Sequence, residues 1–190
     1  MVTLQCKQLI VGYDKPLCKP LNFDLRAGEM LQLKGYNGSG KTTFLKTVLG
    51  SVSCFLGEYV WNVPVSTIGY LPQHQDHSQY FSYTLGEILG LFDIPQEYLK
   101  NLSTDLLTKK WSQASGGEKQ RILILTRIGV STRVLILDEP FNHLDKQTTG
   151  DVSKFLQQLL LAAEPVAILL VSHLNTELKN GSVRVVEINA

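Results

Sequence analysis

The spacing of apolar side chains in the early part of the chain predicts β-strands. Leu21, Phe23 and Leu25 take alternate positions, as in a strand with one buried face. Residues 30–34 (MLQLK) form a further strand that runs straight into a glycine-rich segment. The strands expected in this part cover residues 2–11, 21–25, 30–34, 57–63 and 67–71.

Helical spacing appears after the glycine-rich segment and again in the second half. Residues 42–49 are expected to form a short helix. A second helix is expected from Ser115, which fits a capping box with Glu118, to residue 128, with Gly129 at its far end. A third helix is amphipathic, with apolar side chains at the spacing i, i+3, i+4, i+7. These side chains are Val152, Phe155, Leu156, Leu159, Leu160 and Ala163.

Later strands complete an α/β pattern. Residues 134–137 form a continuous apolar run, as expected of a fully buried parallel strand, and residues 167–171 and 182–188 supply two more strands. Strands that alternate with helices predict a mainly parallel sheet, and the helix-poor N-terminal part predicts an added antiparallel β layer. We expect one domain over residues 1–190, with a core of residues 1–74 and 116–190 and an inserted helical subdomain at about 75–115.

Composition narrows the classes of function. Hydrophobic residues make up 44% of the 190 residues, which is enough for one sizeable core. The net charge of +1 gives no bulk attraction to nucleic acid or anionic lipid. Cys6, Cys18 and Cys54 lack metal-ligand spacing, which indicates reduced thiols in a cytosolic compartment. The N-terminus lacks signal-peptide features, and no apolar stretch reaches the length of about 18 residues that a membrane span needs.

Residues 35–42, GYNGSGKT, satisfy the phosphate-loop pattern G-x-x-x-x-G-K-[ST] between a predicted strand and a predicted helix. Gly38 and Gly40 lack a Cβ and let the backbone approach a phosphate closely. The following helix directs its N-terminal amides at the anion. Lys41 supplies a charge to the β- and γ-phosphate oxygens, and Thr42 supplies a hydroxyl ligand for Mg²⁺. This loop alone leaves GTPases, kinases, helicases and transport ATPases open.

Two acids directly after the apolar strand at 134–137 narrow these classes. Asp138 is placed to hold Mg²⁺ through water, and Glu139 to orient or deprotonate an attacking water. The plainer interpretation of the pair is a solvated turn at a strand end. The chain lacks the guanine-reading N-K-x-D motif, which residues 142–145 (NHLD) do not fit.

The segment from Ala114 to Glu118 (ASGGE), followed by KQR, resembles the signature of the ABC (ATP-binding cassette) ATPase family, usually written LSGGQ. The resemblance covers nearly the whole chain, and Ala114 in place of leucine is its main departure here. The structural alternative is that Ser115 only caps a helix with Glu118 as its partner, and both interpretations can hold together. Two adjacent glycines at a helix start indicate that the backbone there approaches another group closely.

Other family elements follow in order. Tyr13 resembles the aromatic that stacks on adenine, Gln73 the glutamine that reaches Mg²⁺ and the attacking water, and His173 the histidine that contacts the γ-phosphate. Residues 142–145 resemble the segment that crosses the dimer interface, with Asn-His in place of the usual Ser-Ala. For Tyr13 the alternative is a core residue, for Gln73 a polar loop residue, and for His173 a structural histidine.

The resemblance implies that ATP and Mg²⁺ bind between two chains that meet head to tail, as a homodimer or a heterodimer of ABC domains. Its catalytic residues are Glu139 as general base, with Gln73 and His173 as γ-phosphate sensors, and its metal partners are Thr42, Gln73 and Asp138. The residues implied to contact nucleotide are Tyr13, Gly35, Asn37, Gly38, Ser39, Gly40, Lys41, Thr42, Thr43, Ser115, Gly116, Gly117, Glu118 and Asp145.

The function implied is the ATPase subunit of a transporter, on the cytoplasmic face of the inner membrane. Separate integral membrane subunits would dock near residues 74–95, and no nucleic-acid partner is expected. The alternative is a soluble ABC ATPase that acts mechanically on ribosomes or DNA. Such proteins generally carry two cassettes and a basic linker, or a long coiled-coil insert, whereas this chain has one cassette and a short insert. The ASGGE segment and the Asp-Glu pair argue against a third class, the nucleotide kinases.

Overall fold

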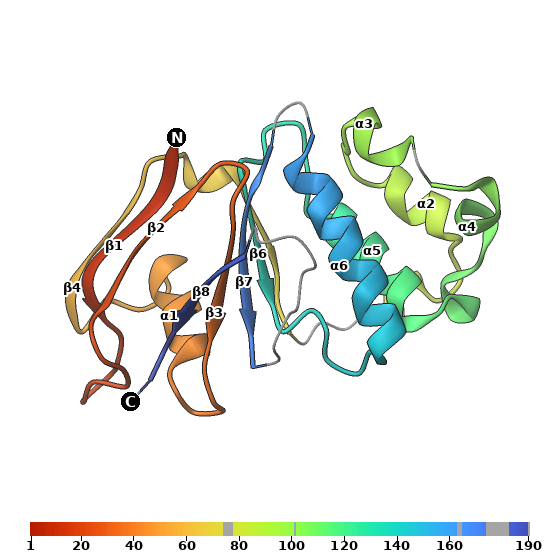
Figure 1. Cartoon of the computed structure of the whole chain (residues 1–190). Helices are drawn as coiled ribbons and strands as arrows, with labels where there is room; N and C mark the ends of the chain where they lie inside the picture. Colours follow the sequence, from red (N-terminus) through yellow and green to blue (C-terminus); the bar gives the residue numbers. More distant parts are fainter. Residues whose placement is uncertain (74–77, 101, 163–164, 174–182, 190) are drawn as a thin grey trace.

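The chain folds into two β-sheets with helices packed between and beside them (Figure 1). The computed structural model describes residues 1–73, 78–100, 102–162, 165–173 and 183–189. Ala163, Ser182 and part of the expected docking segment, residues 74–77, lie outside the described residues. None of the helices in the described part has the length or the apolar run that crossing a bilayer requires.

The first sheet is antiparallel and comes from the N-terminal part of the chain. Its described strands lie in the order β2-β1-β4. They are β1 (Val2–Ile10), β2 (Leu21–Arg26) and β4 (Leu56–Trp61). A bulge interrupts β1 where Gln8 takes a left-handed backbone conformation with φ of 48°. This sheet is the antiparallel layer that the sequence predicts.

The second sheet is parallel throughout its described strands, in the order β5-β6-β7-β3-β8. Its strands are β3 (Met30–Lys34), β5 (Ile68–Leu71), β6 (Val134–Asp138), β7 (Ala167–Ser172) and β8 (Val183–Glu187). Every residue of β6 and β7 is buried, which explains their continuous apolar sequences.

Alternation along the parallel strands separates two hydrophobic cores. Leu31 and Ile136 face a core shared with α1 (Lys41–Val48) and the antiparallel sheet. Met30 and Leu137 face the other core, shared with α5 (Gly116–Leu125) and α6 (Lys146–Leu160). The sheet therefore lies between two packed layers, and the predicted α/β fold class is confirmed.

Three short helices project from one end of the core that contains α5 and α6 (Figure 1). They are α2 (Leu85–Gly90), α3 (Gln96–Leu99) and α4 (Thr104–Thr108). Ile88, Leu106 and Trp111 bury side chains in the core that also contains α5 and α6. These helices fall within the expected helical subdomain, whose limits at about 75 and 115 stay a prediction.

The helix expected to reach residue 128 ends earlier, at Leu125. The hydroxyl of Thr126 donates to the carbonyl of Leu123 at 2.8 Å, and the amides of Arg127 and Ile128 bond three residues back. These tighter bonds close the last turn, so the expectation for Gly129 as the helix cap is wrong. Its amide instead donates to the hydroxyl of Thr132 at 2.8 Å.

Gly69 and Gly150 offer a matched pair for a stability test. A Cβ at Gly69, in β5, would overlap the backbone carbonyl of Arg127, whereas a Cβ at Gly150, within α6, would meet nothing within 4 Å. We expect Gly69→Ala to lower the free energy of unfolding by about 1–3 kcal/mol. Gly150→Ala should raise it by up to about 1 kcal/mol, because alanine is the better helix former. Urea unfolding measures both, and equal stability of the two variants would contradict the close approach at Gly69.

Candidate functional site

The phosphate loop joins the end of β3 to the start of α1. Gly38 and Gly40 take left-handed conformations, with φ of 84° and 96°. Gly40 is the N-cap of α1 and provides no side-chain cap, so the first amides of the helix lack an intrahelical partner. A cavity of about 380 Å³ opens over this helix end, and its lining includes Lys41 and Thr42.

Within the loop, the packing leaves one polar group without a bond. A Cβ at Gly35 would overlap the hydroxyl of Ser39, so the loop closes tightly on itself. The Ser39 hydroxyl is buried and has no hydrogen-bond partner among the described residues. Uncapped amides and a lysine at this cavity, together with an unbonded hydroxyl inside the loop, fit a ligand with several anionic oxygens, such as a polyphosphate.

Lys41, Glu139 and His173 form a chain of charged and polar contacts beside the loop. The Lys41 ammonium donates to the carbonyls of Gly35 at 2.7 Å and Tyr36 at 3.0 Å, and lies 3.8 Å from Glu139 Oε1. Glu139 Oε2 lies 3.0 Å from His173 Nδ1. Lys41 is 8% and Glu139 7% exposed, whereas the His173 side chain is 43% exposed. The Glu139 carboxylate is therefore desolvated and held between two nitrogen groups.

Thr42, Gln73 and Asp138 line the same cavity. Asp138 is the last residue of β6 and is buried. Burial raises the pKa of Tyr70, and the negative charge of Asp138 raises it further. The described residues contain no group of three His, Cys, Asp or Glu side chains that could hold a metal by itself. One carboxylate with hydroxyl and amide oxygens suits Mg²⁺ that also binds substrate phosphates.

The structure places Tyr13 apart from this cavity. Its side chain is 56% exposed and does not line the cavity, whereas Leu17 does. Leu17 lies on a turn closed by the Gly12–Pro16 bridge, and its amide donates to the carbonyl of Val11 at 2.9 Å. Sequence reasoning assigned no role to Leu17 and assigned Asn142 to the dimer interface, whereas the structure places both at this cavity. The only signal for Leu17 was its place, next to Cys18, in a short apolar step between two prolines of a polar loop.

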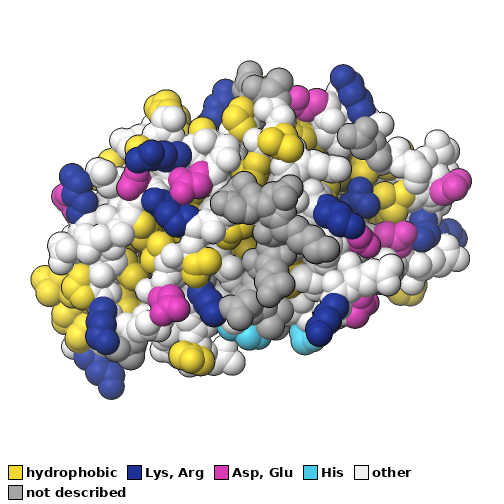
Figure 2. Space-filling view, in the orientation of Figure 1, with side chains coloured by type: hydrophobic (Ala, Val, Ile, Leu, Met, Phe, Trp, Pro, Cys, Tyr) yellow, Lys and Arg dark blue, Asp and Glu magenta, His cyan; other side chains and the backbone are white. Residues whose placement is uncertain are grey.

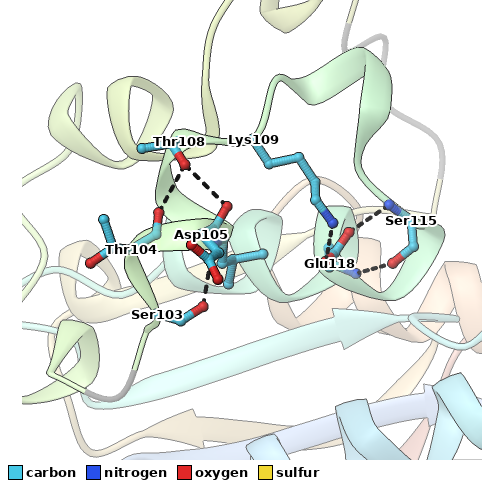
Figure 3. A network of polar contacts seen from close by, with 8 residues as sticks. Ser103, Thr104, Asp105, Thr108, Lys109, Ser115 and Glu118 are labelled. Carbon is cyan, nitrogen blue, oxygen red and sulfur yellow. Dashed lines mark hydrogen bonds and ion pairs between the residues drawn. The ribbon is translucent and has the colours of Figure 1, made fainter.

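Ser115 and Glu118 form the predicted capping box at the start of α5. The Ser115 hydroxyl accepts the amide of Glu118 at 3.3 Å, and Glu118 accepts the amide of Ser115 at 2.7 Å. Lys109 reaches the same carboxylate at 2.7 Å (Figure 3). Burial alone would raise the pKa of Glu118, but the hydrogen bonds from Lys109 and Ser115 hold it below its usual range.

This helix start and the phosphate loop are separate in one chain, because none of the residues from Ser115 to Glu118 lines the cavity at Lys41. The two glycines pack on the chain itself. A Cβ at Gly117 would overlap the methyl group of Thr148, and one at Gly116 would lie 3.2 Å from Leu144. The interpretation that Ser115 caps α5 with Glu118 as its partner therefore has direct support. This cap still leaves the first amides of α5 available to a ligand.

Asp145 is the N-cap of α6. Its carboxylate accepts the amide and the hydroxyl of Thr148, both at 2.9 Å. The bond from the Thr148 amide, more than the other contacts, holds the pKa of Asp145 below its usual range. Asp145 thus fixes the side chain on which Gly117 packs, and its expected contact with nucleotide stays a prediction.

Comparison with known proteins relates the chain to a family. Residues 18–142 match the family described as ABC transporter. The zinc import ATP-binding protein ZnuC of Psychrobacter arcticus is 30% identical over 181 residues, which cover 91% of this chain and 74% of ZnuC. YfmM of Bacillus subtilis, named as an uncharacterized ABC transporter ATP-binding protein, is 33% identical over 89% of this chain. The chain spans only 33% of the length of YfmM.

Solved structures agree with this relation. An inward-facing metal-chelate type ABC transporter superposes with a TM-score of 0.77 at 25% identity, over 99% of this chain and 79% of that chain. An ABC transporter ATP-binding protein from Pyrococcus furiosus superposes with a TM-score of 0.72 at 25% identity, over 97% of this chain and 96% of that chain.

The packing of Gly117 on Thr148 is open to a double-mutant test. Gly117→Ala should lower the free energy of unfolding by about 1–3 kcal/mol, because the new methyl group overlaps that of Thr148. Thr148→Ser removes the methyl group and keeps the hydroxyl that bonds Asp145. In the Thr148→Ser background, Gly117→Ala should cost nothing. Chemical unfolding of the four proteins measures the coupling, and an equal cost in both backgrounds would refute this contact.

Proposed function

The chain belongs to the ABC transporter family, and we propose that it binds ATP with Mg²⁺ and hydrolyses ATP to ADP and phosphate. The ATP-binding domains of this family are ATPases. One observation carries the proposal for this chain: Lys41, Glu139 and an uncapped helix end meet at a single cavity. That arrangement provides a charge for phosphates, a desolvated carboxylate and a set of amide donors.

In the proposed reaction, Lys41 and the amides at the start of α1 hold the β- and γ-phosphates. Glu139 takes a proton from water as that water attacks the γ-phosphorus, and the bond to the bridging oxygen breaks so that ADP leaves. His173, at 3.0 Å from the Glu139 carboxylate, orients it. Thr42, Gln73 and Asp138 would hold Mg²⁺, which neutralises phosphate charge when bound.

We further propose that the chain works as a dimer of ABC domains, homomeric or heteromeric. In one chain, the start of α5 does not reach the cavity at Lys41. The hydroxyl of Ser115 and the first amides of α5 form an anion site that a second chain could use. ATP would then lie between the phosphate loop of one chain and residues 115–117 of the other.

We propose that ATP turnover powers transport through separate integral membrane subunits. The chain would act from the cytoplasmic face of the membrane. ZnuC, named as a zinc import ATP-binding protein, and the solved transporter structure support a transport role. Charges of both signs are interspersed over the face in Figure 2, and the net charge is +1. A nucleic-acid partner is therefore not part of the proposal, and the relatives do not favour action on ribosomes or DNA.

Glu139→Gln should preserve ATP binding and lower turnover by about 10²–10⁴-fold, because the amide cannot accept the proton of the attacking water. Unhydrolysed ATP should then hold two chains together, which gives an ATP-dependent shift to dimer in size-exclusion chromatography. Asp138→Asn serves as the control. If that variant, and not Glu139→Gln, gave the trapped dimer, the roles assigned to the two acids would be wrong.

Mixing two inactive variants tests the shared site. Lys41→Ala loses its phosphate loop, and Ser115→Arg loses the anion site at α5. In a mixed dimer, one site combines both defects and the other combines both intact halves. Each mixed dimer should therefore recover up to about half of the activity of a wild-type dimer, as measured by phosphate release. Absence of recovery over a range of ratios, with mixed dimers shown to form, would count against the shared site.

A further inference from the structure

The proposed anion site at the start of α5 carries a carboxylate beside it. Glu118 closes the capping box with Ser115, so its negative charge lies in the first turn of the helix, beside the first amides. The hydrogen bonds from Lys109 and Ser115 keep the pKa of Glu118 below its usual range despite its partial burial, so the group is ionised at neutral pH. An uncompensated carboxylate at this position would repel a phosphate group.

Lys109 supplies a compensating charge. Its ammonium lies 2.7 Å from Glu118 Oε1, whereas the Ser115 amide donates to the other oxygen, Oε2 (Figure 3). The side chains of Lys109 and Glu118 are 35% and 26% exposed, so water screens the pair only in part. Lys109 does not line the cavity at Lys41 and is outside the catalytic group described above.

The backbone around Lys109 fixes where its side chain begins. The Lys109 carbonyl accepts the amide of Leu85 at 2.9 Å, and the amide of Trp111 donates to the carbonyl of Tyr83 at 2.9 Å. These bonds tie the end of α4 to the start of α2. The backbone of Lys109 is therefore fixed by the segment that contains α2 and α4, whereas the carboxylate that its ammonium contacts belongs to α5.

We propose that Lys109 is a positioning residue for the anion site at α5: it neutralises Glu118 and so permits the γ-phosphate of ATP bound to a facing chain to reach Ser115. This inference rests on the proposed function. Lys109 acts through Glu118 and touches neither ATP nor the reacting water. A neutral glutamine at 118 would keep an acceptor for the Ser115 amide and would make the lysine dispensable.

The test uses the ATP-bound dimer of the Glu139→Gln protein, whose dissociation constant is measured by analytical ultracentrifugation. Adding Lys109→Met should weaken the dimer about tenfold, and Lys109→Arg should restore most of the affinity. Adding Glu118→Gln to the Lys109→Met protein should recover most of the loss. The deficit of Lys109→Met should also shrink as salt is raised from about 0.05 to about 0.5 M, because salt screens the repulsion between Glu118 and phosphate.

Lys7→Met provides a matched control, since it removes the same charge from an exposed ion pair with Glu58 in the antiparallel sheet. It should leave the dimer constant unchanged. ATP affinity and melting temperature are measured for each variant, and Lys109→Gln is included so that a folding defect in one variant does not decide the result. An unchanged dimer constant in the Lys109 variants, or a loss that Glu118→Gln does not repair, overturns the inference. If Ser115→Arg also leaves the dimer intact, the proposed function itself is wrong.

Discussion

Pairing between neighbouring parallel strands is the constraint on which the candidate site depends. Lys34 at the end of β3 pairs with Ser172 of β7, and Asp138 at the end of β6 pairs with Val171. The three strands therefore end at one edge of the sheet. Because apolar side chains pack on both faces, a strand that slipped by one residue would exchange the two cores. The edge is fixed, and with it the phosphate loop, the acid pair and His173.

The backbone of Glu139 turns sharply at this edge. Its φ of 50° is left-handed, a conformation that costs a non-glycine residue about 1–2 kcal/mol. Its amide donates to the carbonyl of Val171 at 2.8 Å, which holds the turn against β7. The turn leaves the carboxylate between Lys41 and His173, where it is nearly inaccessible to water. A strained residue with a buried carboxylate is thus maintained by the rigid strands around it.

Much of the fold could be predicted because its signals are local. The glycine spacing, the acids after an apolar strand and the capping box at Ser115 each involve residues close in sequence, and the structure contains all three. Features that depend on distant contacts were not predictable. The packing of Thr148 on Gly117 and the approach of Leu17 to the cavity arise only when separate elements meet. The early end of α5 depends on a side-chain bond of Thr126 that periodicity does not reveal.

The contacts of the paired glycines with Leu144 and Thr148 join two parts of one chain that would serve different ATP molecules. In the proposed dimer, each ATP takes Glu139 from one chain and Ser115 from the other. The segment after Glu139 leads directly to Leu144 and Asp145, which hold the start of α5 in the same chain. A displacement of that segment at one ATP is therefore transmitted by van der Waals contact to the other ATP. In the proposed dimer, this contact would couple the two sites, so that binding of ATP at one would change the affinity of the other.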